Sequence, residues 1–268
     1  MVSLKISGGS FRKPVDGLGD IPFWCFYLLR YLAEDQSRKL VITVGGGNII
    51  RKQNFLRSIA FLSSIKFAGD GQLRVMDQQP HKELDKMGML ATNVNAQWLT
   101  WLINEAIDQN RESSTYGCLS SRKAVFLTSF APENQDQLYG VGRARDELGE
   151  GNIVVLGGGT GKSGVTTDTA AVMRAVELKL GSVLKITHTE YGIWWENEIS
   201  RKMTHQDFLD RGIKQILDRT AVCLAKEENL GIFVFNPNAP VGKDGEGLHN
   251  LPLALDGDGR RFGSLVCS

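Results

Sequence analysis

The sequence predicts an α/β protein with a mainly parallel sheet that helices cover on both faces. Short apolar, β-branched segments alternate with amphipathic segments along the chain, as is typical of strand–helix–strand units. Three of the predicted strands run directly into glycine-rich turns. With 268 residues and 42% hydrophobic content, the chain can bury the core of one large domain, so we expect residues 1–268 to form a single domain.

The N-terminal half contains three apolar segments that we interpret as strands. They are residues 2–6, 40–44 and 124–128. The first two end at the turns 7–10 and 45–48. Helices are predicted at residues 23–33 and 87–107, the second with an apolar face of Leu99, Leu102, Ile103 and Ala106. Residues 52–86 are mixed and polar, and we expect a short helix and a long loop there.

The C-terminal half continues the alternation. Three more strands are predicted, at residues 152–156, 182–187 and 231–236. Helices are predicted at 137–148, from Thr166 or Thr167 to about Leu180 with Gly181 as the cap, and at 208–226. Residues 188–205 show no clear period and are expected to form a covering loop, and residues 251–267 a terminal hairpin.

Charge and cysteine content exclude several classes of protein. Thirty-one basic and 30 acidic residues give a net charge of +1, so no overall field attracts nucleic acid or an anionic membrane. The four cysteines are dispersed and lack the spacing of a metal site. The sequence starts without a hydrophobic leader and has no apolar run long enough to span a membrane. We therefore expect a cytoplasmic protein with no nucleic-acid or membrane partner.

Residues 154–171 carry the strongest phosphate-binding pattern in the chain. A buried strand leads into several glycines, and then a helix begins with Asp168 in its first turn. Unpaired backbone N–H groups at such a helix start bind phosphate. Gly161-Lys162-Ser163 matches the second half of a P-loop, but Leu156 stands where the first half requires glycine. We therefore do not expect a P-loop, and an ordinary glycine-rich connection is the alternative.

Two basic residues are also candidates for binding phosphate. Lys5 lies in the first strand just before its glycine turn, and Arg51 follows the second glycine turn. Both side chains are suited to phosphate oxygens. For each residue an alternative stays open: a solvated lysine at a sheet edge, and a solvated surface arginine.

The glycine turns stand beside three further motifs in a fixed order: Asp85–Thr92, Thr160–Ala171, and Asp218–Ala221 followed by Val234–Asn236. Together they resemble the bacterial uridylate (UMP) kinases, a group within the amino acid kinase superfamily. The resemblance covers nearly the whole chain. It implies a single amino acid kinase-like domain, a three-layer αβα sandwich, ATP-dependent phosphorylation of UMP to UDP, Mg²⁺ as cofactor and a homo-oligomer, usually a hexamer.

The resemblance also implies roles for individual positions. The catalytic pair is Lys5 and Asp168. ATP-binding positions are Lys5, Ser7, Gly8, Gly47, Arg51, Thr187 and Trp194. Acceptor-binding positions are Gly46, Asp85, Thr160, Gly161, Thr166 and Thr167. No acidic ligand for Mg²⁺ is identified from the sequence.

Several positions differ from the family pattern. Residues 187–192 are one residue longer than the usual Thr-Lys and Asp-Gly segment, and Asn197 replaces an aspartate. These differences concern the donor base. Lys162–Val165 replaces the usual Asn, Pro and two aromatic residues, and the segment between Arg51 and Asp85 is longer than usual. These differences concern the acceptor.

The implied chemistry needs no strong base. A nucleoside monophosphate is already largely ionised at neutral pH, since its second pKa is about 6, so catalysis consists of positioning and charge neutralisation. The lack of a Ser/His/Asp or Cys/His constellation agrees with this. Three alternatives stay open: a related kinase with another phosphate, carboxylate or carbamate acceptor, a non-catalytic nucleotide- or oxyanion-binding protein, and an α/β domain whose glycine turns are structural.

Overall fold

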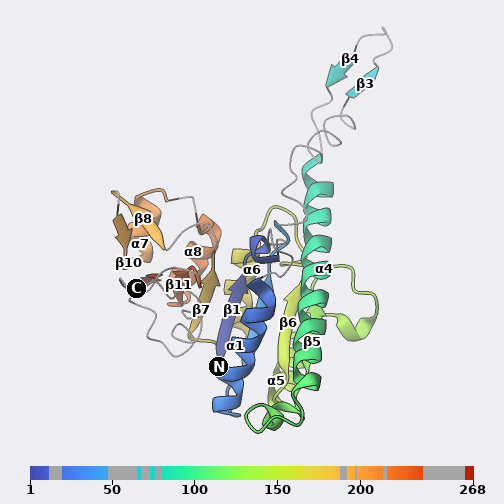
Figure 1. Ribbon diagram of the computed structural model, residues 1–268. Coiled ribbons are helices and arrows are strands. Elements are labelled where there is room, and N and C mark those ends of the chain that lie inside the picture. Colours follow the sequence, from blue (N-terminus) through green and yellow to red (C-terminus); the bar gives the residue numbers. More distant parts are fainter. Residues whose placement is uncertain are drawn as a thin grey trace.

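A computed structural model describes residues 1–11, 20–47, 65–67, 73–75, 80–187, 192–196, 198–213, 216–237 and 263–268. A large twisted sheet lies in the middle, and helices cover both of its faces (Figure 1). The predicted α/β fold, a three-layer αβα sandwich, is confirmed.

Eight strands form the central sheet in the order β10-β12-β11-β7-β1-β2-β6-β5. Their bounds are β1 Val2–Ile6, β2 Leu40–Val44, β5 Ala124–Thr128, β6 Ile153–Gly157, β7 Ser182–Ile186, β10 Lys202–Thr204, β11 Gly231–Phe235 and β12 Gly263–Cys267. From β11 to β5 every neighbouring pair is parallel, whereas β12 runs antiparallel to β11 and parallel to β10. The loops that follow the six parallel strands therefore leave from one edge of the sheet.

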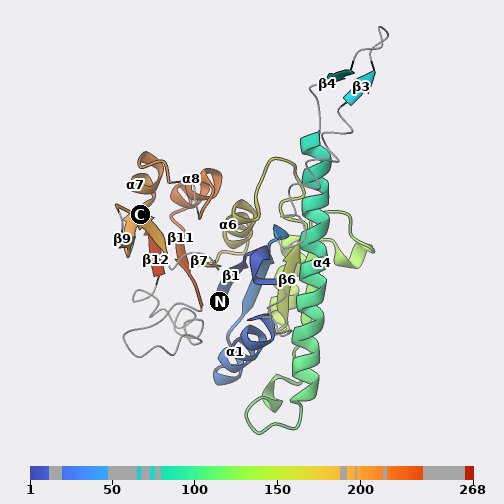
Figure 2. The same ribbon diagram turned by 45° about the horizontal axis from the view of Figure 1, so that its top comes forward.

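The helices alternate with these strands. Their bounds are η1 Gly8–Phe11, α1 Asp20–Glu34, α4 Pro80–Gln109, η2 Gly117–Leu119, η3 Gln135–Gln137, α5 Val141–Gly149, α6 Thr167–Glu177, α7 His205–Asp210 and α8 Arg219–Glu227. Two small sheets join β3 Ile65–Phe67 to β4 Leu73–Val75 and β8 Ile193–Trp195 to β9 Glu198–Ser200. The helix α4 extends beyond the sheet, with β3 and β4 past its N-terminal end (Figures 1 and 2).

Alternation along the strands divides the core into two clusters. In β2, Leu40 and Ile42 belong to one cluster, and Val41, whose side chain points to the opposite face, belongs to the other. Helices α1 and α4 pack over the first face, and α5, α6 and α8 pack over the second. Strands buried on both faces read as continuous apolar runs, which is why their positions could be predicted from the sequence.

The prediction for residues 52–86 is wrong where the structure describes them. Two short strands, β3 and β4, pair there, and α4 already begins at Pro80. Proline suits the first helical turn, because its missing N–H would have no partner inside the helix. The predicted helix 137–148 also begins late, at Val141, because Gly140 is extended and acts as its N-cap.

The helix predicted at 208–226 is wrong as well, since two helices occupy this region. Helix α7 ends at Asp210, and Gly212 then adopts a left-handed φ of 63°. Helix α8 begins at Arg219, and the Asp218 carboxylate accepts a hydrogen bond from the Ala221 N–H at 2.7 Å. Asp218 is therefore an N-cap and does not lie in the middle of a helix.

Two other boundaries differ from the prediction. Residues 188–205, predicted as a loop, include the short strands β8, β9 and β10, which at three residues each are too short to show a period. Helix α6 ends at Glu177, and the left-handed residue after it is Lys179, with φ 58°, in place of the predicted Gly181 cap. Of the predicted terminal hairpin, residues 251–262 lie outside the described residues. In the part of the chain that the structure describes, no helix is long and apolar enough to cross a membrane.

Candidate active site

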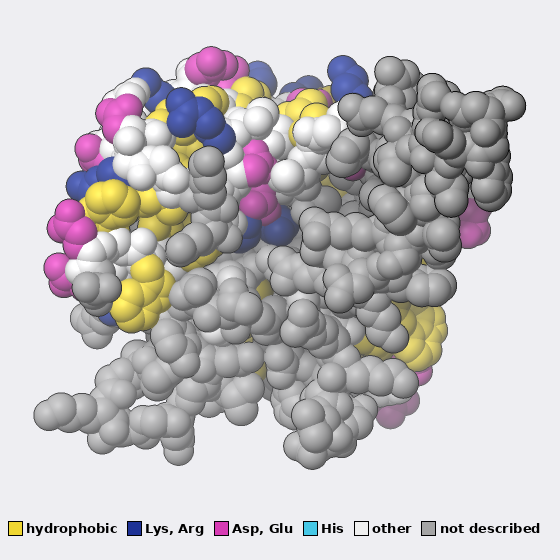
Figure 3. Space-filling view, turned by 90° about the horizontal axis from the view of Figure 1, so that it is seen from above, with side chains coloured by type: hydrophobic (Ala, Val, Ile, Leu, Met, Phe, Trp, Pro, Cys, Tyr) yellow, Lys and Arg dark blue, Asp and Glu magenta, His cyan; other side chains and the backbone are white. Residues whose placement is uncertain are grey.

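A pocket of about 340 Å³ lies at the carboxyl ends of β1, β2 and β7, beside the N-termini of α6 and α8. Its walls are Lys5, Ser7, Gly8, Gly9, Gly45, Gly46, Gly47, Thr166, Thr167, Asp168, Lys185, Thr187, Ile216, Leu217 and Asp218. Acidic and basic side chains meet near the middle of this face (Figure 3). Ligands of parallel α/β sheets bind at this edge, so the pocket is the candidate active site.

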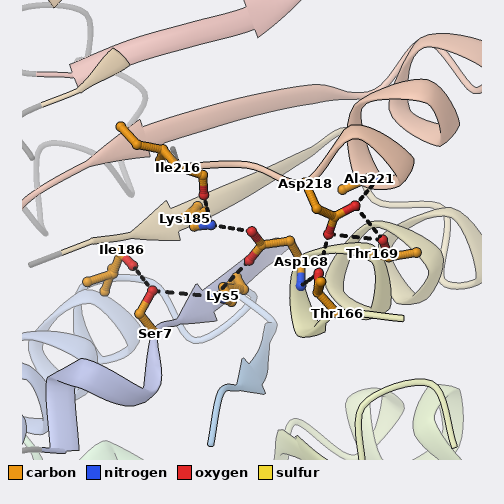
Figure 4. Close-up of polar contacts among 10 residues, drawn as sticks. All are labelled: Lys5, Ser7, Thr166, Asp168, Thr169, Lys185, Ile186, Ile216, Asp218 and Ala221. Carbon is orange, nitrogen blue, oxygen red and sulfur yellow. Dashed lines mark hydrogen bonds and ion pairs between the residues drawn. The ribbon is translucent and has the colours of Figure 1, made fainter. Parts of the chain in front are cut away.

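One carboxylate and two ammonium groups form the centre of the pocket (Figure 4). The Asp168 Oδ1 atom lies 2.7 Å from Lys5 Nζ, and Lys185 Nζ donates a hydrogen bond to Oδ2 of the same carboxylate. Lys185 Nζ also donates to the Ile216 carbonyl, and Lys5 Nζ donates to Ser7 Oγ at 3.3 Å. Asp168 therefore holds both lysines through its two oxygens.

The sheet places the two lysines side by side. Lys5 in β1 and Lys185 in β7 are register partners in a parallel pair, so both side chains project from the same face. Each is almost buried, with 7% of the side chain exposed, and Asp168 exposes 11%. Charges buried to this extent are costly unless they are paired, and Asp168 in the first turn of α6 supplies the partner.

Burial and mutual charge change the proton affinity of the cluster. Burial lowers the pKa of Lys185 to about 8, helped by the nearby charge of Lys5 and opposed by Asp168. For Asp168, burial would raise the pKa, but the charges of Lys5 and Lys185 outweigh it and lower the pKa to about 2. One carboxylate therefore contacts two ammonium groups, while Asp218 adds a second carboxylate to the pocket lining. The two ammonium groups are the part of the pocket that would attract an anion.

Both ammonium groups keep hydrogen-bonding capacity toward such an anion. An ammonium has three N–H donors. The described hydrogen bonds use one donor of Lys5 and two of Lys185, and Lys5 also forms the ion pair with Asp168. Each lysine can therefore direct one further donor at a phosphate oxygen.

The glycine turns after β1 and β2 form one wall of the pocket. They touch each other so closely that a Cβ atom on Gly8 would lie 2.0 Å from the backbone nitrogen of Gly47. Only glycine allows this approach. The Ser7 side chain, which follows β1, donates to the Ile186 carbonyl at 2.8 Å and ties the first turn to β7.

The N-terminus of α6 forms the opposite wall. Thr166 is its N-cap and accepts a hydrogen bond from the Asp168 N–H at 3.1 Å, as predicted. The Thr166 hydroxyl also donates to Asp218, and Thr169 Oγ1 donates to the same carboxylate at 2.9 Å. Asp218 therefore joins the starts of α6 and α8 and fixes the helix end that carries Asp168 (Figure 4).

The glycine loop between β6 and α6 is attached to helix α4. Its Gly158 N–H donates to Thr92 Oγ1, and its Gly164 N–H donates to Asp85 Oδ2, each at 2.7 Å. Both acceptors lie in α4. Lys162 is exposed and is not among the residues that line the pocket, and α6 begins only at Thr167. The exclusion of a P-loop is therefore confirmed.

The structure brings most of the predicted site residues together. The pocket is lined by Lys5, Ser7, Gly8, Gly46, Gly47, Thr166, Thr167, Asp168 and Thr187. Asp85, Thr160 and Gly161 lie outside this lining and belong to the glycine loop or its support. Trp194 lies in β8 with 41% of its surface exposed and is also outside the lining. Arg51 and the unusual residues 188–191 and 197 lie outside the described residues.

The sequence interpretation missed Lys185 and gave no role to Asp218. Lys185 lies in the apolar strand β7, just as Lys5 lies in the apolar strand β1. A lysine inside a buried strand requires a charge partner, so this shared pattern could have identified Lys185. The N-cap role of Asp218 was hidden because α7 and α8 were predicted as one helix.

Comparison with known proteins identifies a family and individual proteins whose sequences are similar to this chain. The profile of the amino acid kinase family matches residues 4–236. A uridylate kinase of Bradyrhizobium sp. (strain ORS 278) is 33% identical over 208 residues, 75% of this chain and 73% of that protein. A uridylate kinase of Rhodopseudomonas palustris (strain ATCC BAA-98 / CGA009) is 30% identical over 247 residues, 89% of each chain.

Solved structures share the fold. The UMP kinase from Bacillus anthracis superposes with a TM-score of 0.72 at 24% identity, over 98% of this chain and 94% of that chain. The UMP kinase from Ureaplasma parvum gives a TM-score of 0.69 at 19% identity, over 99% and 97% of the two chains.

Proposed function

The chain belongs to the amino acid kinase family, and we propose that it transfers the terminal phosphoryl group of ATP to UMP, forming UDP and ADP. The observation that carries this proposal is the Lys5–Asp168–Lys185 cluster between the glycine turns and the α6 N-terminus. The relatives named uridylate kinase, which match along most of the chain, support UMP as the acceptor.

The reaction forms a bond between a UMP phosphate oxygen and the γ-phosphorus of ATP, and it breaks the bond between that phosphorus and the leaving ADP oxygen. The UMP oxygen is already ionised, so no residue needs to remove its proton. Negative charge is spread over the transferring group and the ADP oxygen. The remaining N–H donors of Lys5 and Lys185 are suited to stabilising that charge.

Asp168 positions the two lysines and does not act as a base. The two ammonium groups keep its pKa near 2, so it stays ionised at neutral pH. Its two oxygens are used for Lys5 and Lys185. Without this carboxylate the buried ammonium groups would repel each other, and their geometry around the phosphoryl group would be lost.

For the substrates we adopt the following assignment. The ATP contacts are Lys5, Ser7, Gly8, Gly47, Arg51, Thr187 and Trp194, and the UMP contacts are Gly46, Asp85, Thr160, Gly161, Thr166 and Thr167. The touching turns at Gly8 and Gly47 support the first set because they offer backbone N–H groups to phosphates. The pocket positions of Gly46, Thr166 and Thr167 support the second set.

We propose that Mg²⁺ enters with ATP. The described residues contain no group of three or more potential metal-binding side chains. The oxygens of Asp168 and Asp218 already accept hydrogen bonds or ion pairs. These residues fit an ion held chiefly by phosphate oxygens and water, as is common for Mg²⁺ in phosphoryl transfer. When bound, the ion would neutralise phosphate charge.

We also propose that the chain forms a homo-oligomer through α4. Five large apolar side chains on this helix are 40–57% exposed, at spacings of three or four residues: Met87, Leu90, Val94, Trp98 and Trp101. They are symmetric about Val94, so a second copy in antiparallel orientation would place Met87 opposite Trp101 and Leu90 opposite Trp98. A two-fold interface requires such self-complementarity.

Two proposals concern the chain as a whole. We propose that residues 1–268 form one amino acid kinase-like domain, and the family match over 233 residues from 4 to 236 supports this.

We also propose a cytoplasmic location. Three described cysteines, Cys118, Cys223 and Cys267, are free thiols, and free thiols are typical of a reducing compartment.

A nucleotide panel tests the proposed function. The protein is incubated with ATP, Mg²⁺ and each of UMP, CMP, dUMP, AMP and GMP, and diphosphate formation is measured. We expect UDP to form fastest and Asp168→Asn to abolish most of the transfer. Transfer to a different acceptor would identify another kinase of the family. Binding of ATP without any transfer would identify a non-catalytic nucleotide-binding protein.

A further inference from the structure

Arg174 is a buried charged residue of α6 outside the pocket, and it faces Ser129, the residue that follows β5. Only 6% of its surface is exposed. Its Nη1 donates to both Glu177 oxygens, at 2.9 and 2.7 Å, and its guanidinium lies 4.0 Å from the centre of the Tyr139 ring. The Tyr139 hydroxyl donates to Glu177 Oε2 at 2.6 Å. Burial and the bond to Glu177 raise the pKa of Tyr139, so this donor keeps its proton.

The second arm of this guanidinium points toward the glycine loop. Arg174 Nη2 donates to Ser129 Oγ at 2.8 Å. Ser129 follows β5, and its backbone lies against the loop between β6 and α6. A Cβ atom on Gly161 would be 2.5 Å from the Ser129 carbonyl oxygen, and Gly161 has a left-handed φ of 75°. The middle of the loop is therefore in contact with the residue that Arg174 holds.

Through Ser129, the glycine loop is connected to the helix that follows it. Residues 158–166 connect β6 to α6. Gly161 of this loop touches Ser129, and Arg174 of α6 donates a hydrogen bond to the same serine. The same loop is held on its other side by Asp85 and Thr92 of α4. The contacts with Asp85 and Thr92 thus attach the loop to α4, and the contact through Ser129 and Arg174 links it to the helix that carries Asp168.

We propose that Arg174 is a positioning residue for the acceptor nucleotide, acting through Ser129 on the loop 157–164. Glu177 and Tyr139 hold the guanidinium so that its free edge meets Ser129. The inference rests on the proposed function, in which this loop contacts UMP. Arg174 lies outside the pocket lining, and its described contacts are with Ser129, Glu177 and Tyr139 and not with the turns after β1 and β2.

The experiment compares equilibrium binding and hydrogen exchange in the full-length chain. Ser129→Ala removes the acceptor and leaves the Arg174–Glu177 pair intact, and Arg174→Lys keeps the charge but lacks the fork that reaches both partners. Ser200→Ala, at a strand end far along the chain, is the matched control. The Kd values for UMP and for ATP are measured by calorimetry, and amide exchange is followed for residues 157–164.

For Ser129→Ala and Arg174→Lys we expect the Kd for UMP to rise about tenfold, the scale of one lost hydrogen bond to a charged group. The Kd for ATP should stay within about twofold. Amides of 157–164 should exchange faster, and the double variant should be no weaker than the worse single variant, since both changes break one link. Ser200→Ala should change none of these quantities.

Other results overturn the inference. Equal loss of ATP and UMP binding would indicate a general structural role for Arg174, and unchanged exchange at 157–164 would show that Ser129 does not hold the loop. A wild-type protein that binds no UMP would refute the proposed acceptor instead. In that case the exchange measurement still decides whether Arg174 positions the loop.

Discussion

Lys5 and Lys185 are register partners in adjacent parallel strands, and their ammonium groups bind opposite oxygens of one carboxylate, Asp168. The sheet and the first turn of α6 therefore set the spacing of two positive charges before any substrate is present. Pre-placed charges of this kind stabilise a transition state without reorganisation at the moment of reaction.

Removing either lysine should slow phosphoryl transfer far more than it weakens binding. We expect Lys185→Ala and Lys5→Ala each to lower kcat by roughly 10²–10³, the range for one pre-placed electrostatic contact. Steady-state kinetics with UMP and ATP measure this. Lys202→Ala, an exposed lysine on β10, is the control. Because the lysines share Asp168, the Lys5→Ala/Asp168→Asn double variant should lose much less than the product of the single losses. If the kcat losses of the two single variants multiply fully in the double variant, Lys5 and Asp168 do not act as one unit.

The low pKa of Lys185 predicts an alkaline limit to activity. Burial and the charge of Lys5 lower this pKa to about 8, and the proposed role requires the protonated form. The kcat/KM for ATP should therefore be highest below pH 8 and fall as the pH rises through that value. Arginine stays protonated in this range, so Lys185→Arg should lose the alkaline decline in whatever activity it retains. The same decline in the arginine variant would assign it to another group.

Much of this site could be predicted from the sequence because its parts are local. A buried strand followed by glycines, and Thr166 before Asp168 at a helix start, have signals within a few residues. The partners of those parts are not local. Lys185 meets Asp168 only because β7 pairs with β1, and Asp218 meets Thr166 only because α8 packs beside α6. Such contacts depend on the order of strands in the sheet, which no short stretch of sequence encodes.

The fold shows the same division. The bounds of β2 and β5 were predicted to the residue, since each is a continuous apolar run between polar segments. Errors occurred where short elements follow one another, as in α7, α8 and β8 to β10. There the tertiary contacts stabilise segments too short to have a period of their own.

Asp85 offers a test of how the acceptor is recognised. Its Oδ2 accepts a hydrogen bond from the Gly164 N–H at 2.7 Å. The alternative hypothesis for this acceptor-binding position is that the carboxylate accepts a hydrogen bond from the ribose 2′-OH of UMP. Asp85→Ala should weaken UMP more than ATP under either role. The comparison with dUMP separates them, because dUMP lacks the hydroxyl. If Asp85 binds it, dUMP should lose less affinity than UMP in Kd measurements. Equal losses of affinity for UMP and dUMP would show that Asp85 holds the glycine loop and does not bind the hydroxyl.

The apolar stripe on α4, residues 87–101, predicts how the assembly can be broken. Val94 would lie on the two-fold axis and is 57% exposed in the single chain. The Val94→Glu change would place two carboxylates against each other inside an apolar interface, and like charges facing each other cost several kcal/mol. We expect the dissociation constant of the oligomer to rise by roughly 10²-fold or more, seen as a smaller species in sedimentation velocity.

The matched control for this change is Leu138→Glu. Leu138 is also a large exposed apolar residue, at 45%, but it follows η3 and lies outside the stripe. The control should leave the oligomer intact, because a charge at an exposed position away from an interface has little effect on association. Equal sensitivity of both variants would argue against an interface on α4. A wild-type chain that sediments as a monomer at micromolar concentration would exclude the interface altogether, and the exposed tryptophans would then need another partner.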